Sequence, residues 1–412
     1  MTLKFSVAMI ARNEETTLHR SLGSIKPLLD TGDAELIFCD TGSIDNTIEV
    51  AKQYTDKIYV HPWQNDFSFH RNKSFELCTG DWIFQLDADE ELVWGLKDPK
   101  EFISLLDQMK PEITAAAFMM QDIQKGQIVC HTDAVRMFRR GKVIYKRRVH
   151  NEPMYEGDTG KIPETICFMK HYGYDMTPYQ KKKKAERTIP LLIKSIEEDP
   201  TDYDSLFYIA NAYTSWGAQP DTGLKYAQEY LSHKDEIGEP FNQSVYYLMC
   251  GILEYKKDVQ LWHDTIEAGL KSQMNDMDLW WSMLRYGLFT KNPDDLMQGA
   301  TNFIRCAETF PKDRQDKKII GQKFFFTYNP EYIAKALYYI FLGNLETSMV
   351  ALEKLEVALK HCSQSVKEEL SDHIVDDFKQ FKLEDQRVVK SPAPFKEKLR
   401  ELRRNHTMGA RR

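Results

Sequence analysis

The sequence predicts an α/β domain followed by an all-α helical repeat domain. Through about residue 178, short apolar segments alternate with amphipathic segments, the pattern of strands joined by helices in a largely parallel sheet. After that point, apolar residues recur at helical spacing in paired segments, as in helical repeat proteins. We therefore expect three parts: residues 1–178, residues 179–385 and a tail, residues 386–412.

Composition excludes several classes of protein. Hydrophobic residues make up 42% of the 412 residues and charged residues 28%, which excludes a disordered or fibrous chain. No apolar run approaches the roughly 18–20 residues that span a bilayer, so no transmembrane segment is expected. The first ten residues are interrupted by Lys4 and Ser6, unlike a signal peptide. Seven cysteines without repeated spacing favour a reducing compartment, and we expect the cytoplasm.

The tail is basic, with nine Lys/Arg and two Asp/Glu in a chain of net charge −7. We expect a solvated terminus; an arm that contacts phosphate or another acidic surface is the alternative. The lysine run at 181–184 is likewise expected to be a solvated helix start.

The first elements follow from periodicity and from polar breaks. Each expected strand is a short apolar run that ends in polar residues, and each expected helix has apolar residues three and four apart. The expected strands are residues 5–10, 35–40, 57–60 and 81–86, and the expected helices are residues 16–29, 47–54 and 71–78. Four β segments joined by loops follow, at residues 114–120, 135–138, 143–145 and 165–169.

The second half of the chain reads as helices. Residues 181–196 and 203–216 each have one apolar face, and the second of them is followed by Gly217 and another helical segment. This helix–turn–helix approximates a tetratricopeptide (TPR) unit, and weaker pairs follow at irregular spacing. We expect Trp216, Trp262, Trp280 and Trp281 to belong to the core of these repeats.

The segment Asp87-Ala88-Asp89 is the sharpest chemical feature. Residues i and i+2 of an extended segment project to the same side, so both carboxylates face one point. Two neighbouring anions repel each other unless a cation lies between them. Mg²⁺ or Mn²⁺ meets that need, and such ions commonly bridge carboxylates to substrate phosphates.

Other polar residues follow the expected strands. Asn13 and Glu14 follow the first strand and Asp40 ends the second, where they can hydrogen-bond a base and a ribose. Capping of the following helices is the simpler explanation for Asn13, but it leaves Asp40 without a role. Arg71 is expected at a helix start, where a cation is unfavourable for the helix dipole, so an anionic partner is expected.

Four blocks of residues together resemble the family 2 glycosyltransferases in order and spacing. They are residues 7–14, 40–47, 65–72 and 79–91. Residues 136–139, 149–153 and 171–174 resemble a subgroup with TPR-like helices, which includes the peptide S-glycosyltransferases of glycosylated bacteriocin biosynthesis. The resemblance covers residues 1 to about 175.

This resemblance implies a GT-A nucleotide-diphospho-sugar transferase fold and inverting transfer from a UDP-sugar. By position, the nucleoside would be held by Ala11, Asn13, Glu14 and Asp40. Arg71 would lie near the base or the diphosphate, and Asp87 and Asp89 would hold the sugar diphosphate and its Mg²⁺ or Mn²⁺. The metal would offset the charge that grows on the leaving group.

The catalytic base and the remaining metal ligands are less sharply predicted. Asp133 and Glu152 are the candidates for the base that deprotonates the acceptor, and we favour Glu152. A structural ion pair with a nearby arginine is the alternative for each. His150 and His171 are candidate late metal ligands, with hydrogen-bonded structural histidines as the alternative.

The acceptor is left open among several classes. We favour a peptide or protein side chain, selected by the helical half. The same chemistry on a glycan, a lipid-linked saccharide or a modified nucleic-acid base is the first alternative, although an acidic body disfavours nucleic acid. A noncatalytic helical scaffold with an inactive transferase domain is the second. Whether the chain forms a homodimer is also left open.

Overall fold

The structure is a computed structural model, and it describes residues 3–95, 98–216, 219–238, 241–315 and 330–343, with single positions between 351 and 370. It divides into two compact units, Met1–Ile237 and Gly238–Arg412, which are described separately. The basic tail at residues 386–412 lies outside the described residues.

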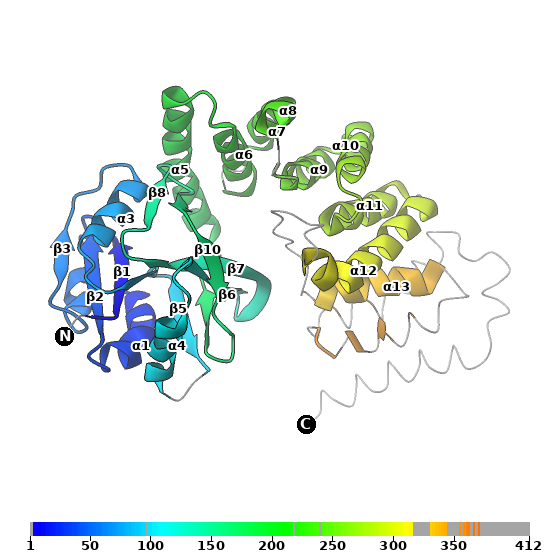
Figure 1. The fold of residues 1–412 in the computed structure, drawn as a ribbon. Helices are drawn as coiled ribbons and strands as arrows, with labels where there is room; N and C mark the ends of the chain where they lie inside the picture. Colours follow the sequence, from blue (N-terminus) through cyan, green and yellow to red (C-terminus); the bar gives the residue numbers. More distant parts are fainter. Residues whose placement is uncertain are drawn as a thin grey trace. The chain divides into compact units, whose positions relative to one another are not determined.

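The first unit is built on a mixed sheet with the strand order β3-β2-β1-β4-β7-β6-β11-β5, and β10 pairs with β6 at its side (Figure 1). The strands β3, β2, β1 and β4 are parallel, whereas β7 runs antiparallel to both β4 and β6. The strands are β1 Phe5–Ala11, β2 Ala34–Asp40, β3 Ile58–Val60, β4 Trp82–Gln85, β5 Glu90–Trp94, β6 Ile113–Gln124, β7 Gln127–Arg139, β10 Asp158–Lys161 and β11 Cys167–His171. A separate hairpin joins β8 Val143–Lys146 to β9 Glu152–Tyr155.

Apolar side chains cover both faces of this sheet. On one face, helices α1 (Leu18–Leu29) and α4 (Pro99–Gln108) pack on Phe5, Phe38 and Phe84. On the other face, helix α3 (Phe67–Glu76) and the β8–β9 hairpin pack through Phe75 and Tyr145. Short helix α2 (Thr47–Ala51) follows β2. This layering leaves the carboxyl ends of β1, β2 and β4 at one edge, where ligands of open α/β sheets bind.

The expected strands and helices are present, with changes at several ends. Helix α3 begins at Phe67, four residues before the expected start at Arg71, because the side chain of Asp66 caps it by accepting from the Phe69 N–H. Arg71 therefore lies inside the helix, and the expectation of a helix start there was wrong. The strands β5, β9 and β10 were not expected from the sequence.

The chain turns helical at Pro178, where a capping box between Thr177 and Gln180 starts α5. Helices α5 to α8 belong to the first compact unit, and they are α5 Pro178–Glu198, α6 Tyr203–Asn211, α7 Pro220–Ser232 and α8 Lys234–Ile237, with a π-helical turn, Ala212–Trp216, after α6. Leu191, Leu192 and Ile209 from α5 and α6 form a core with Val149 of the preceding domain. Helices α5 and α6 therefore pack against the domain that contains the sheet.

The second unit contains antiparallel helices. They are α9 Ser244–Lys256, α10 Val259–Ser272, α11 Met277–Thr290, α12 Pro293–Gln315 and α13 Pro330–Gly343. Trp262, Trp280 and Trp281 are buried in this unit as expected, whereas the side chain of Trp216 lies outside the described residues. Among the described residues, no helix is both long and apolar enough to cross a bilayer.

Candidate active site

Loops after β1 and β2 are tied together at the carboxyl edge of the sheet. The backbone N–H of Asn13 donates to Ser43 Oγ at 2.9 Å, and Asn13 Oδ1 accepts from the Ile44 N–H at 2.8 Å. Asn13 has a φ of 57°, in the left-handed region that asparagine tolerates better than most residues. Asn13 thus joins the loop after β1 to the loop after β2.

Asp40 is buried at this edge, and one of its two carboxylate oxygens is hydrogen-bonded. Its Oδ2 accepts from the backbone N–H groups of Gly42 and Ser43 at 2.8 and 3.0 Å. Its Oδ1 is buried without a hydrogen-bond partner among the described residues. Since buried polar atoms are normally paired, an oxygen in this position fits a donor supplied by a ligand.

Ala11 and Glu14 lie at the same edge of the sheet. The carbonyl of Ala11 accepts from the Thr41 N–H at 2.9 Å, which fixes the turn after β2. Glu14 accepts from the Thr17 hydroxyl at 2.6 Å. Burial raises the pKa of Glu14, with smaller contributions from the charges of Asp89 and Asp45, while the Thr17 hydrogen bond and Arg187 lower it. The charge of Asp89, in the loop after β4, thus acts on Glu14, in the loop after β1.

Asp87 lies after β4 beside two arginines. Arg71 Nη2 is 2.9 Å from Asp87 Oδ1 and 3.1 Å from Oδ2. Arg136 Nη2 is 4.0 Å from Asp87 and 2.7 Å from Oε1 of the buried Glu90. The anionic partner expected for Arg71 is therefore Asp87, and the cations offset the repulsion within the acidic segment.

Asp89 faces His171, which ends β11. The two side chains are 3.7 Å apart, from Oδ2 to Nε2, while His171 Nδ1 is 2.7 Å from Asp122 Oδ1. Burial lowers the pKa of His171, but the hydrogen bonds and charges of Asp122 and Asp89 outweigh it and raise the pKa to about 10. A carboxylate behind a histidine is the usual arrangement that orients a metal-binding imidazole.

Gly173 keeps the space beside these two side chains open. A Cβ at Gly173 would lie 2.5 Å from His171 Nε2 and still closer to Asp89 Oδ2. Among the described residues, no group of three or more His, Cys, Asp or Glu side chains could by itself hold a metal ion. A divalent ion held by Asp89 and His171 would have to take its other ligands from phosphate and water.

The first unit matches the family model of glycosyl transferase family 2 over residues 6–155. Residues 6–155 are a family 2 glycosyltransferase domain. The mixed sheet with its ligand edge after β1, β2 and β4 is GT-A-like, as the resemblance predicted.

Two relatives match about two thirds of this chain. A TPR repeat-containing protein of Synechococcus elongatus is 31% identical over 66% of this chain and 66% of its own length. The SPbeta prophage-derived glycosyltransferase SunS of Bacillus subtilis is 28% identical over 62% of this chain and 55% of its own length. The chain thus spans just under two thirds of the first relative and about half of the second. The helices after the glycosyltransferase domain are TPR-like, and this prediction is confirmed.

A solved structure of S. aureus TarS, residues 1–349 with UDP, is similar over 76% of this chain and 92% of its own. The identity is 11% and the TM-score 0.34, so no inference is drawn from it.

The two base candidates of the glycosyltransferase domain each make an ion pair. Asp133, on β7, is 3.0 Å from Lys161 of β10. Glu152 starts β9 and is 3.4 Å from Arg147, with about half of its side chain exposed. Arg147 also pairs with Asp202, at the start of α6. The role of either carboxylate as the base stays a prediction.

His150 belongs to the same loop as Glu152. Its ring stacks on Tyr208 of α6, with centroids 3.8 Å apart and planes 7° from parallel. Arg148 in this loop makes a paired contact with Glu198 of α5, at 2.6 to 2.9 Å. The loop therefore joins the glycosyltransferase domain to the helices that follow, whereas His171 is the histidine beside Asp89.

Helix α5 brings further cations to the edge of the glycosyltransferase domain. Within the lysine run at 181–184, Lys182 and Lys183 are exposed as expected, but Lys184 is partly buried and interacts electrostatically with Asp89 and Asp87. Burial lowers the pKa of Lys184, and the two carboxylates partly oppose that effect. Arg187 interacts in the same way with Glu14.

Several residues of the site were missed in the sequence analysis. They are Glu90, Asp122, Arg136, Lys184 and Arg187. Glu90 directly follows Asp89, so its position next to the acidic segment was a signal that could have found it. Arg136 begins the block of residues 136–139 that carries the family resemblance, which was a signal for it as well. Asp122, Lys184 and Arg187 come from a strand and a helix whose register no local pattern reveals.

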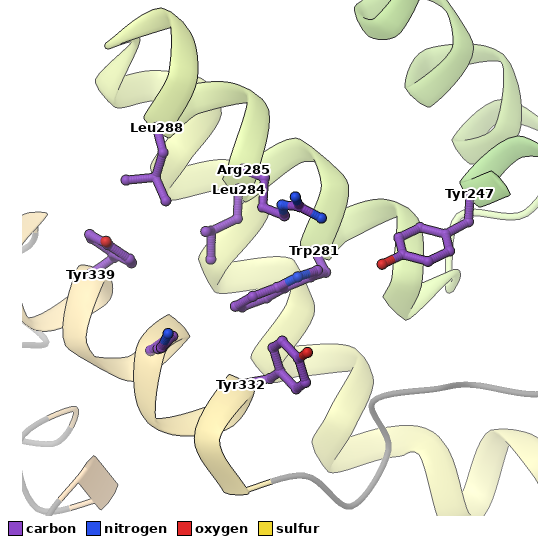
Figure 2. Close-up of a pocket in the computed structure, with 8 residues that line it drawn as sticks. Tyr247, Trp281, Leu284, Arg285, Leu288, Tyr332 and Tyr339 are labelled. Carbon is purple, nitrogen blue, oxygen red and sulfur yellow. The ribbon is translucent and has the colours of Figure 1, made fainter. Parts of the chain in front are cut away.

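The second unit has a pocket of its own, of about 360 Å³ (Figure 2). Its walls come from α9, α11 and α13, and it is lined by Tyr247, Trp281, Leu284, Arg285, Leu288, Tyr332, Lys335 and Tyr339. Trp281 and Tyr332 meet edge to face, with centroids 4.7 Å apart. Arg285 is positioned by Glu254 at 2.6 Å. The pocket combines aromatic surface with two cations.

Proposed function

We propose that this chain transfers a sugar from a UDP-sugar, with inversion, to a side chain of a peptide or protein. The support for the reaction class is the family 2 glycosyltransferase domain. Since the chain spans only part of its relatives, the activity and the substrates of the whole protein are proposals.

The observation that carries the proposal is the buried Oδ1 of Asp40, which has no partner among the described residues. A pyrimidine imide N–H is a donor that would satisfy it, and the loop of Asn13 and Glu14 lies beside it. Ala11, Asn13, Glu14 and Asp40 would thus hold the nucleoside, and uracil fits because it carries an imide N–H.

The sugar diphosphate would lie between the nucleoside loops and Asp87 and Asp89. Asp89 and His171 would hold Mg²⁺ or Mn²⁺, which would offset the charge on the departing diphosphate when bound. Arg71 holds Asp87 in a fixed orientation toward the edge. We keep His171 in preference to His150 as the ligand, because the His150 ring is stacked on Tyr208.

The acceptor would attack the anomeric carbon from the side opposite the diphosphate, which inverts that carbon. Its proton would pass to a carboxylate, either Glu152 or Asp133. Glu152 is paired with Arg147 and Asp133 with Lys161.

A polypeptide acceptor is supported by the pocket of the second unit. Tyrosine, tryptophan and arginine are the side chains that dominate binding energy at protein interfaces. Arg285 and Lys335 suit acidic side chains of a bound segment, and Trp281 and Tyr332 suit its apolar ones. The TPR-like helices would thereby select the acceptor.

Nucleotide binding and sugar release test the proposal together. Wild-type protein would be titrated with UDP and incubated with a panel of UDP-sugars and Mg²⁺ or Mn²⁺, and UDP release would be measured. We expect UDP binding and slow hydrolysis of at least one donor. A chain that neither binds UDP nor releases it from any donor would instead be a noncatalytic scaffold. Mass spectrometry of peptide libraries incubated with the active donor then identifies the acceptor.

A further inference from the structure

We propose that helix α5 supplies two cations, Lys184 and Arg187, that bind the diphosphate of the donor. The inference rests on the proposed function, which it deepens by assigning residues beyond the matched glycosyltransferase domain, residues 6–155. Lys184 and Arg187 both belong to the first compact unit.

The start of α5 is built to hold these residues in place. The helix follows β11 by a short loop, and the capping box of Thr177 and Gln180 sets its first turn. Leu191 and Leu192 of this helix form a core with Val149, against which Phe67 packs, and this core anchors the helix on the domain. Lys184 and Arg187 are three residues apart and so lie on adjacent turns of one helix face.

Lys184 is placed at the acidic segment. Its ammonium interacts electrostatically with both Asp89 and Asp87. It also lies 5.6 Å from the centre of the Tyr174 ring, and that ring meets His171 edge to face at 4.8 Å. Tyr174 thus holds Lys184 on the side of Asp89 where His171 lies.

Arg187 is placed at the nucleoside loops. Its guanidinium interacts with Glu14, in the loop after β1, and lies 5.4 Å from the centre of the Phe67 ring. Lys184 therefore interacts with Asp89, after β4, and Arg187 interacts with Glu14, in the nucleoside loop after β1. A diphosphate that joins a nucleoside to a sugar must lie between the nucleoside loops and Asp89.

The charge of the other side chains favours additional cations beside the proposed metal ion. Asp87, Asp89 and Glu14 would repel a diphosphate, and Arg71 and Arg136 are already paired with Asp87 and Glu90. Lys and Arg are the side chains that proteins use to bind phosphate oxygens. In the proposed complex, phosphate oxygens would interact with these two cations in addition to the carboxylates that already do so electrostatically.

The same helix offers a matched control. Lys182 and Lys183 are exposed and pair with Glu186, at 3.9 and 2.9 Å. Replacing Lys182 removes one positive charge from α5 without changing the face that carries Lys184. A general effect of helix charge would therefore appear equally in Lys182→Ala and Lys184→Ala.

Calorimetric titration of UDP and of uridine separates diphosphate binding from nucleoside binding. We expect Lys184→Ala and Arg187→Ala each to weaken UDP binding about tenfold or more, the scale of one hydrogen bond to a charged group. Uridine affinity should stay within about twofold, and Lys182→Ala should match wild type for both ligands. Lys184→Arg should retain most of the UDP affinity, since its charge is kept.

Each of the other possible outcomes contradicts either this inference or the proposed function. If folded variants bind UDP as wild type does, or lose UDP and uridine affinity equally, the inference is wrong while the proposed function stands. If wild type binds UDP no better than uridine, the diphosphate has no binding site and the inference also fails. If wild type binds neither ligand, the proposed function itself is wrong.

Discussion

His171 Nε2 lies 3.7 Å from Asp89 Oδ2, although the two residues are far apart in the sequence. Antiparallel pairing places His171 beside Glu90 in the register of β11 and β5. Parallel pairing of β11 with β6 sets Asp122 on its other side. The register of β11 with its two neighbouring strands therefore places His171 beside Asp89.

Asp89→Ala should abolish sugar transfer while the fold stays intact. The variant removes a carboxylate that we place at the metal and diphosphate, so a fall of about 10²-fold or more in turnover is expected. Circular dichroism would check the fold, and Asp81→Ala, an exposed carboxylate 4.0 Å from Lys4, is the control. Turnover near the wild-type level would contradict the role of Asp89.

Gly173→Ala should impair transfer by filling the space between Asp89 and His171. The new Cβ would lie 2.5 Å from His171 Nε2, so one of the two side chains must move. Gly251→Ala in α9 is the matched control, because a Cβ there meets nothing within 4 Å. The control should gain about 0.5–1 kcal/mol in stability, since alanine favours helix. Equal turnover in both variants would argue that the space is not used.

Asp40→Asn should weaken UDP and uridine binding to the same extent. The substitution leaves only one carbonyl oxygen, so a donor amide would either face the imide N–H or replace the oxygen that accepts from Gly42 and Ser43. A loss of about tenfold or more is expected in both affinities. Calorimetry would measure it, and unchanged uridine binding would place the base elsewhere.

One of the two base variants, Asp133→Asn or Glu152→Gln, should lose transfer but retain UDP binding. Both are isosteric and remove the ability to accept a proton, so the rate should fall about 10²- to 10⁴-fold in the variant that carries the base. Single-turnover assays alongside UDP titration distinguish the two cases. Normal rates in both variants would show that another group accepts the proton.

Glu35 should make stability depend on acid pH. Burial raises its pKa, but hydrogen bonds from Lys57, Ser6 and Thr79 outweigh this and lower the pKa to about 2. Its contribution is therefore complete above the unfolded pKa of 4.5 and is lost as pH falls from 4.5 towards 2. Glu35→Gln should cost up to about 3 kcal/mol at pH 7, and the difference from wild type should shrink below pH 4.5. Urea unfolding at several pH values measures both, and a difference independent of pH would refute the assignment.

Much of the site was predictable because its residues follow strands directly. Asn13, Asp40, Asp87 and Asp89 each come at the end of an apolar run, and parallel strands bring such ends to one edge. Lys184 was not predictable, because four consecutive lysines look alike in the sequence. Only the docking of α5 separates Lys184, beside Asp89, from Lys182 and Lys183, which pair with Glu186.

The sequence by itself determined the order of strands and helices through β4, the family of the first domain and the edge where its acidic residues gather. Local periodicity and short motifs carry that information, because they depend on neighbours along the chain. Only the tertiary structure decided that His171, Asp122 and the cations of α5 surround Asp89, and that the His150 loop joins α6. Strand register and helix docking are set by packing between distant segments, which no local pattern records.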